Sequence, residues 1–437
     1  MKLLDTIQQL YSSFRIEMVL KVFVMFMVLL TATPQVVCSA EFNVDSTTML
    51  RTRQTTDDKN LFPAYEYLSL SANDFFDPRL SFYAGAWGKL ELSNEDSEDE
   101  TEGELQYAYI NFRSESNNLV ANMGRQFVVD GGISEHIDGV YLRTDLPVGF
   151  GISTFIGKPV IEDTKDYEED FTYGGRISHS SLGFYTVGLS YLSTENDGDR
   201  SREEESFDIW FHPMTLIDIT GQSSYNSVTE GWMEHDYTLS LMPSEKLSFD
   251  VNFSQVNYGD YFYHMSTNVF SLITLSNPTG SIDSAEEMKN VGGSIAYSPV
   301  DWVTFSGDYK NFDYKIAGSA DLYGGSLTLT PSSFPDFISG TSVHRMKGDS
   351  DELRYWAYRL FASYKIKDFK TSLDLLDLVF DQRISGVKNS FVAVASGSYE
   401  MNDRTEIGGS LDYSQSPEFE YEVRGMLSLT CLFGRAK

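Results

Sequence analysis

Cysteine is almost absent from this chain. Its 437 residues include only Cys38 and Cys431, and Cys38 lies in a segment that we expect to be removed on export. The remaining chain therefore cannot form an internal disulfide, and it has neither a Cys-x-x-Cys-His motif for covalent haem nor a zinc-binding pattern. Its stability has to come from backbone hydrogen bonds and from side-chain packing.

Basic residues are also scarce. The chain has 33 Lys and Arg against 64 Asp and Glu, a formal net charge of -31. A field of this sign repels nucleic acid and attracts cations, so we expect no nucleic-acid partner. Glycine-rich phosphate loops, nucleotide-binding fingerprints and basic patches are absent as well. With 41% hydrophobic residues, however, the chain is too apolar to be a disordered acidic protein.

Long apolar runs are missing except at residues 19–30, where the run is interrupted by Lys21. This run is too short to cross a bilayer comfortably, and the small residues 38–40 suit a cleavage site. We predict a secretory signal over residues 1–40, cut after Ala40, with Met18 as an alternative start. An uncleaved anchor helix and a lipoprotein modified at Cys38 are the alternatives. Any other crossing of a membrane has to be made by strands.

Side chains alternate along most of the remaining chain. In residues 421–433 nearly every second residue is apolar or small, and residues 79–92 place apolar side chains such as Leu80 on one face and polar ones such as Lys89 on the other. A period of two is typical of a β-strand with two different faces. We therefore predict an all-β fold, in which residues 41–78 form a periplasmic lead-in with a possible first strand from Ala64.

The links between these segments alternate as well. Short turns, such as those at Pro147 and at residues 367–368, take turns with long polar links near 94–104, 159–170 and 193–205, which carry clusters of acids. Tight turns at one end and longer loops at the other are typical of transmembrane β-barrels, whereas a soluble sandwich or propeller does not need this rhythm. We predict a transmembrane antiparallel up-and-down β-barrel over residues 79–437. It would have about 18 strands (roughly 16 to 20), short periplasmic turns and long acidic extracellular loops.

Two segments resemble parts of bacterial outer-membrane barrels. The aromatic Phe433 near the end of the last alternating strand resembles the closing strand of that family, which pairs with the first strand and removes the open sheet edges. Residues 122–127, with the run Gly-Arg-Gln, resemble a strand end found in many Gram-negative porins. In porins the link after such a strand folds into the lumen. The resemblance therefore implies a constriction in which three acids face two arginines: Asp130, Glu135 and Asp138 against Arg125 and Arg143. The alternative is a wall arginine paired with a neighbouring acid beside a solvated loop.

The resemblance implies a porin-like channel in the outer membrane, exported through a cleaved signal peptide. Small hydrophilic solutes or ions would diffuse passively through it, and fixed acids would favour cations. Its surroundings would be outer-membrane lipid and lipopolysaccharide, and a homotrimer is left open. We expect no enzymatic activity and no cofactor; weak binding of Ca²⁺ or Mg²⁺ by the acidic links is the alternative.

Two other functions stand as hypotheses. The chain also resembles porin-like barrels that sheathe multihaem cytochromes, and it would then be a structural sleeve of an electron conduit. The third hypothesis is a hydrolase at the barrel rim, for which His235, flanked by Glu234 and Asp236, is the candidate.

Overall fold

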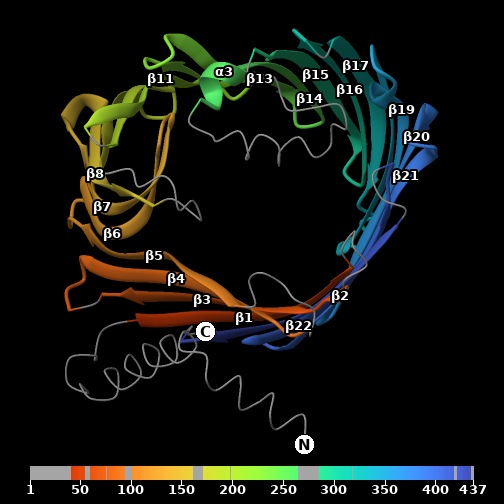
Figure 1. Cartoon of the computed structure of the whole chain (residues 1–437), viewed down its shortest axis with the longest axis horizontal. Coiled ribbons are helices and arrows are strands. Elements are labelled where there is room, and N and C mark those ends of the chain that lie inside the picture. Colours follow the sequence, from red (N-terminus) through yellow and green to blue (C-terminus); the bar gives the residue numbers. More distant parts are fainter. Residues whose placement is uncertain are drawn as a thin grey trace, which may run out of the picture.

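The structure is a computed structural model that describes residues 41–54, 60–74, 76–93, 101–160, 171–196, 198–263, 285–316, 318–417 and 421–434. The predicted signal over residues 1–40 and the acidic links 94–100 and 161–170 lie outside the described residues. The described strands belong to one antiparallel sheet, which is seen end-on in Figure 1. The elements, in chain order, are β1 (Glu41–Gln54), β2 (Asn60–Leu61), β3 (Pro63–Asn73), β4 (Leu80–Glu91), β5 (Thr101–Arg113), β6 (Leu119–Asp130), β7 (Ile133–Asp145), η1 (Pro147–Gly149), β8 (Phe150–Pro159), β9 (Phe171–Ser181), β10 (Tyr185–Asn196), β11 (Asp199–Met214), β12 (Ile217–Asn226), β13 (Gly231–Ser244), β14 (Leu247–Asn257), α3 (Tyr258–Tyr261), β15 (Glu287–Val300), β16 (Val303–Tyr314), β17 (Gly318–Leu329), β18 (Phe337–Gly348), η2 (Asp351–Leu353), β19 (Arg354–Ile366), β20 (Phe369–Ile384), β21 (Val387–Asn402), β22 (Thr405–Gln415) and β23 (Glu422–Phe433).

The sheet closes on itself. β1 pairs with β3 along one edge and with β23 along the other, from Val44 opposite Phe433 to Arg53 opposite Arg424. The two residues of β2 continue the line of β3 beyond Phe62 and pair with the same strand, β1, so the closed barrel has 22 strands. The prediction of a closed antiparallel barrel is confirmed, and the predicted number of about 18 strands is wrong.

The first strand differs most from the sequence-based expectation. Residues of the segment expected to be a lead-in form β1 and β2, and β3 covers the possible first strand expected from Ala64; all three are part of the barrel. β1 has hydroxyl side chains on both faces, with Ser46 and Thr48 on one and Thr47 on the other, so its sequence lacks the alternation that marks the other strands. Its partners define it, because closing the ring satisfies the backbone groups of an otherwise open edge.

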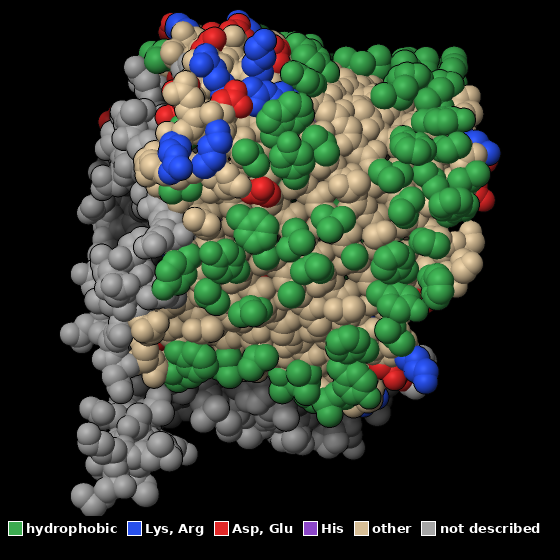
Figure 2. Space-filling model, turned by 90° about the vertical axis from the view of Figure 1, so that its right-hand side faces the viewer, with side chains coloured by type: hydrophobic (Ala, Val, Ile, Leu, Met, Phe, Trp, Pro, Cys, Tyr) green, Lys and Arg blue, Asp and Glu red, His purple; other side chains and the backbone are tan. Residues whose placement is uncertain are grey.

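The register fixes an inner and an outer face around the whole ring, because paired residues on neighbouring strands project their side chains to the same side of a sheet. On one face of β23, Val423, Leu427 and Phe433 are exposed to 42%, 63% and 55%, and this is the outer face. Figure 2 shows the outside of the barrel from the right-hand side of Figure 1: apolar side chains are spread over most of this face, and most of the charged ones lie at the upper left and along the right-hand edge. An apolar surface of this kind is required where a barrel faces lipid.

No helix among the described residues is long and apolar enough to cross a membrane.

Several links that were expected to be long are short or belong to strands. The expected link at 193–205 lies largely in β10 and β11, and the link expected after the Gly-Arg-Gln segment is reduced to Gly131 and Gly132 between β6 and β7. The acids at 203–205 lie in β11, and those at 102 and 104 lie in β5. Acidic extracellular loops are therefore not supported by the part of the chain that the structure describes.

The ring is unevenly curved (Figure 1). β14–β20 form a wide arc, which we name the open arc, whereas β6–β11 turn so sharply that β7 and β10 approach each other across the interior. We name this second region the curl. Its inner face contains a cluster of buried apolar side chains, namely Val128, Ile133, Ile137, Phe155 and Leu192, with Tyr141 packed against it.

Candidate functional site

The distal part of the β6–β7 hairpin leaves the barrel wall. β5 begins at Thr101, yet its pairing with β6 stops at Ala108 opposite Arg125, although β6 continues to Asp130. Gly124 lies at the point of departure with a φ of 129°, and a Cβ there would clash with the carbonyl oxygen of Ala108. Only glycine accepts this backbone conformation in so little space.

Side chains of the hairpin replace the strand pairing that β5 loses. Arg125 Nη1 donates to the carbonyl oxygen of Leu105 over 3.0 Å, and His136 Nε2 lies 2.7 Å from the carbonyl oxygen of Gln106. The backbone groups of an open sheet edge need partners, so these contacts stabilise the departure of the hairpin from the wall.

The tip of the hairpin docks on the inner faces of β9 and β11, across the interior of the curl. A Cβ on Gly131 would clash with Arg176 and Asp208, and a Cβ on Gly132 would clash with Ser206. Gly131 also has a φ of 61°, in the region that favours glycine. The two glycines thus bring the backbone of the turn against inward-facing side chains of β9 and β11.

Two acids of the hairpin form ion pairs with arginines of β9 and β11. Arg176 Nη1 lies 3.1 Å from Asp130 Oδ1, and its Nε and Nη2 donate to the two oxygens of Asp208 over 2.9 and 2.5 Å. Tyr141 donates to the other oxygen of Asp130 over 2.9 Å. The side chains of Arg176 and Asp130 are only 10% and 7% exposed. A buried ion pair is tolerated when further hydrogen bonds of this kind saturate the charges.

The second acid is Glu135, which is paired with Arg202 of β11. Arg202 Nη2 also donates to Glu204 Oε2 over 2.9 Å, and Tyr263, just beyond α3, reaches Glu204 with its hydroxyl over 3.5 Å. The apolar cluster of the curl is joined to the same hairpin through Val128, Ile133 and Ile137. The hairpin is therefore fixed in the lumen by both charge and packing.

The five residues predicted to form the constriction separate into two groups. Asp130, Glu135 and Arg143 lie on the inner face, whereas Arg125 and Asp138 lie on the opposite face of the sheet. Arg125 pairs with Asp138 itself, through contacts of 2.8 and 2.7 Å, and Arg143 has Asp145 as its partner at 3.5 Å. The structure thus places the acids Asp130 and Glu135 opposite other arginines than those named from the sequence.

Sequence reasoning missed Arg176 and Arg202. Arg176 lies at an inward position of β9, between Gly174 and Ser178. The alternation of side chains along that strand could therefore have predicted that Arg176 points into the lumen. Its partners on β6 and β11 follow from the curvature of the sheet, which the local pattern does not encode.

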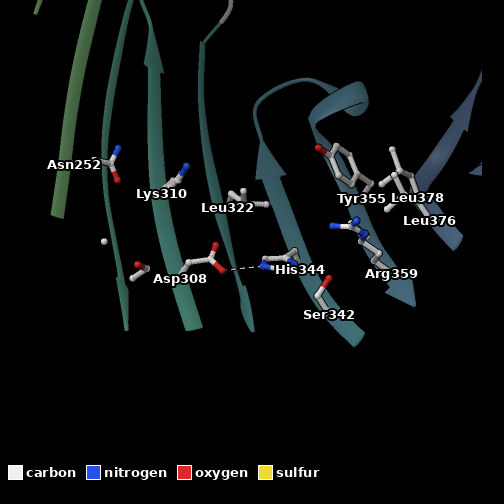
Figure 3. Close-up of a pocket in the computed structure, with 13 residues that line it drawn as sticks. Asn252, Asp308, Lys310, Leu322, Ser342, His344, Tyr355, Arg359, Leu376 and Leu378 are labelled. Atoms are coloured by element: carbon white, nitrogen blue, oxygen red, sulfur yellow. Dashed lines mark hydrogen bonds and ion pairs between the residues drawn. The ribbon is translucent and has the colours of Figure 1, made fainter. Parts of the chain in front are cut away.

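The open arc contains a cavity of about 560 Å³ on its inner face, lined by residues of β14–β20 (Figure 3). Asp308 of β16, Gly324 of β17 and His344 of β18 follow one another across the ladder. A Cβ on Gly324 would clash with the ring of His344, so this glycine lets His344 Nε2 reach Asp308 Oδ1 over 2.8 Å. Lys310, Arg359, Tyr355 and three leucines complete the cavity with small polar residues.

The predicted acid–histidine cluster at the rim is divided between the two faces of β13. Glu234 points inward and accepts a hydrogen bond from Gln222 over 2.8 Å. His235 points outward, where its Nδ1 lies 2.7 Å from Ser223 Oγ and its ring contacts that of Trp232 at 4.9 Å. Its surroundings are those of an aromatic girdle at a lipid interface. Within the described residues, no group of His, Cys, Asp and Glu has the arrangement to hold a metal ion.

No protein-family profile and no curated protein sequence matches this chain. Its fold is similar to that of solved structures. These include a double mutant of the ferric enterobactin receptor PfeA from Pseudomonas aeruginosa (11% identity, covering 90% of this chain and 81% of that chain, TM-score 0.57) and the siderophore receptor PirA from the same organism (12%, 90%, 80%, TM-score 0.56). The translocation pore of the P pilus usher PapC is also similar (8%, 91%, 100%, TM-score 0.50). At such identities the likeness shows the fold alone, which is that of outer-membrane β-barrels of Gram-negative bacteria.

Proposed function

We propose that this protein is an outer-membrane channel through which small hydrophilic solutes and ions diffuse passively, with a preference for cations. The observation that carries the proposal is the contrast between the two faces of the closed barrel. On the side shown in Figure 2 the outer face carries a broad spread of apolar side chains, and the inner face of the open arc leaves a cavity of about 560 Å³ lined by charged, hydroxyl and apolar side chains. An aqueous lumen inside an apolar shell is the basic construction of a porin.

The β6–β7 hairpin supports this function by narrowing the lumen. Its contacts with Arg176 and Arg202 hold it against β9 and β11, so the interior of the curl is filled by the chain's own side chains. Passage is then left to the side of the open arc. A fixed constriction of this kind sets the size of the solute that can pass.

The preference for cations is inferred from acids on the inner face that lack a basic partner. Asp250 of β14 accepts hydrogen bonds from Ser240 and Ser294 over 2.6 and 3.3 Å, and within the described residues no lysine, arginine or histidine pairs with it. An acid whose charge is not neutralised by a neighbouring base attracts cations into the lumen and repels anions.

Single-channel recording in a planar bilayer under a salt gradient tests the proposal. We expect discrete conductance steps and a reversal potential biased towards cations, and Asp250→Asn should move that potential towards zero. The matched control is Asp377→Asn, because Asp377 lies on the outer face of β20, opposite Tyr358 and Phe391, and should leave the potential unchanged. A properly folded chain that never conducts would overturn the proposal.

The sleeve around a multihaem cytochrome makes a different prediction. A sleeve should co-purify with haem absorbance from its native membrane and conduct no ions while it is filled. The hairpin that occupies the curl reduces the room for such a partner, and this favours the open channel.

A further inference from the structure

The cavity of the open arc has both polar and apolar side chains in its lining. Asn252, Lys310 and His344 present polar groups, and Leu322, Leu376 and Leu378 present apolar ones, all on the inner face (Figure 3). At about 560 Å³ the cavity is within the range of roughly 300–1,000 Å³ that is typical of small-molecule sites.

Lys310 is a positive charge without a partner in the part of the chain that the structure describes. Its neighbours across the ladder are Gly292 and Leu322, and neither offers an acceptor side chain. A Cβ on Gly292 would lie 2.8 Å from Lys310 Cγ, so the missing side chain leaves room for the lysine stem along the wall. No hydrogen bond or ion pair joins Lys310 to another described residue, in contrast to the other bases of this cavity.

The other charged side chains of the cavity, Asp308 and Arg359, already have partners, although Arg359 uses only some of its donors. Asp308 is engaged by His344 at 2.8 Å, and among the described residues no ion pair joins it to Lys310. Arg359 uses Nε and Nη2 on Asp374, with contacts of 2.9 and 2.5 Å. A guanidinium has five N–H donors, and the Nη1 group of Arg359 therefore remains for a second acceptor. The cavity thus offers donors for an anionic group at both ends.

The leucines indicate what the rest of the ligand is made of. Leu376 and Leu378 of β20 and Leu322 of β17 are half-buried inner-face residues, and Tyr355 lies beside Leu378 (Figure 3). Apolar surface that faces water is unfavourable by about 25 cal/mol per Å². A ligand with an apolar body would cover these side chains, whereas a small inorganic ion would not.

We propose that this cavity is a binding site for an amphipathic organic anion, with its carboxylate on Lys310 at one end and its hydrocarbon chain or ring along Leu322 towards Leu376 and Leu378. A carboxylate on a lysine or arginine makes a charge-assisted hydrogen bond, which is stronger than a neutral one. This inference rests on the proposed channel function, since the site would hold a solute during its passage. It departs from the overall preference for cations by placing a local anion site within an acidic lumen.

Calorimetric titration of the detergent-folded full chain with hexanoate tests the site without requiring conduction. We expect hexanoate to bind at least tenfold more tightly than acetate, which lacks the chain, and than hexylammonium, which lacks the carboxylate. Lys310→Met should weaken hexanoate binding at least tenfold, and Leu376→Ser should weaken hexanoate but leave acetate unchanged. Lys315→Met is the matched control, because Lys315 lies beyond the end of β16, outside the cavity lining, and should bind hexanoate like the unmodified chain.

The outcomes separate this inference from the channel function. Failure of the unmodified chain to bind hexanoate, equal binding by Lys310→Met, or equally tight binding of hexylammonium would each overturn the site. A chain that conducts ions but shows one of these results is a channel without the site. A chain that binds hexanoate as expected but conducts nothing retains the site and refutes the channel.

Discussion

The curl and the open arc are built from the same kind of strand but use their inner faces differently. In the curl, the inner faces of β6–β11 approach each other, and the charges between β6, β9 and β11 are buried and paired, as in Arg176 with Asp208 at 10% and 17% side-chain exposure. In the open arc, Arg359 and Asp374 form a pair of the same chemistry and the same 2.5 Å distance at 51% and 38% exposure. The comparison shows that curvature, rather than residue type, decides whether an inward charge is structural or available to solutes.

Glycine contributes to both outcomes. In the curl, Gly131 and Gly132 allow side chains of the opposite wall to come into contact with the backbone of the hairpin. In the open arc, Gly292 and Gly324 leave the space in which Lys310 and His344 lie along the wall. The glycines of the curl therefore allow close contact across the lumen, whereas those of the open arc leave space along its wall.

The largest expected difference between the two regions concerns their ion pairs. Arg176→Met leaves Asp130 and Asp208 buried without a base, which should lower the free energy of unfolding by about 3–5 kcal/mol. It should also release the hairpin and raise single-channel conductance. The matched variant Arg359→Met removes an exposed pair, worth about 1 kcal/mol or less. Denaturant unfolding of the detergent-folded barrels measures both, and equal losses would show that the curl is not a buried region.

Loss of a packed side chain should also lower the free energy of unfolding more in the curl than in the open arc. Phe155→Ala removes a ring that is 2% exposed in the curl, and we expect a loss of about 3–5 kcal/mol in the free energy of unfolding. Leu376→Ala on the open arc should lose about 1 kcal/mol or less, because that side chain is half-buried. The same unfolding experiment compares them, and a larger loss for Leu376→Ala would contradict the assignment of the core to the curl.

The sequence was sufficient for the class of fold and for the orientation of many strands. The alternation in residues 421–433 predicted the outward face of β23, and that face is exposed in the barrel. The same pattern failed for β1, whose hydroxyl residues lie on both faces, and strand counting failed with it. The position of β1 is determined by its pairing with β3 and β23, and its own sequence has no alternation of polar and apolar residues from which the strand could be predicted.

The candidate site was predictable only in part for a related reason. The porin resemblance predicted Asp130 and Glu135 as residues of a constriction, and in the structure both lie on inner positions of the hairpin. Their partners Arg176 and Arg202 lie on β9 and β11. Contacts between such distant strands depend on where the sheet bends, which is set by Gly124 and by the contacts of the whole ring rather than by spacing along the chain.

Substitution of the turn glycines should give a smaller effect than loss of the buried pair. Gly132→Val places two methyl groups against Ser206 of β11, and overpacking of this kind should lower the free energy of unfolding by about 1–3 kcal/mol and increase the conductance as the hairpin is displaced. Gly386→Ala, at the β20–β21 turn, meets no atom within 4 Å but has a φ of 84°, so it should cost roughly 1–2 kcal/mol through backbone strain alone. Conductance is the deciding measurement, because only the change in the curl should alter it; a similar increase for both variants would refute the role of the hairpin as the constriction.

The smallest effect is expected at the rim of the open arc, outside the spanning strands. The backbone N–H of Ser319 donates to Asp349 over 2.7 Å, and this hydrogen bond lowers the pKa of Asp349 below its ordinary value of 3.8. A lowered pKa stabilises the folded chain above the ordinary value, and the contribution disappears as the pH falls through the lowered one. Asp349→Asn should therefore slightly reduce stability at pH 7 and flatten its decline between pH 5 and pH 2, because the exposed carboxylate no longer titrates. Unfolding curves at the two ends of this range test the sign; a variant that is more stable at pH 7 and declines as steeply as the unmodified chain would show that the contact with Ser319 does not stabilise the rim.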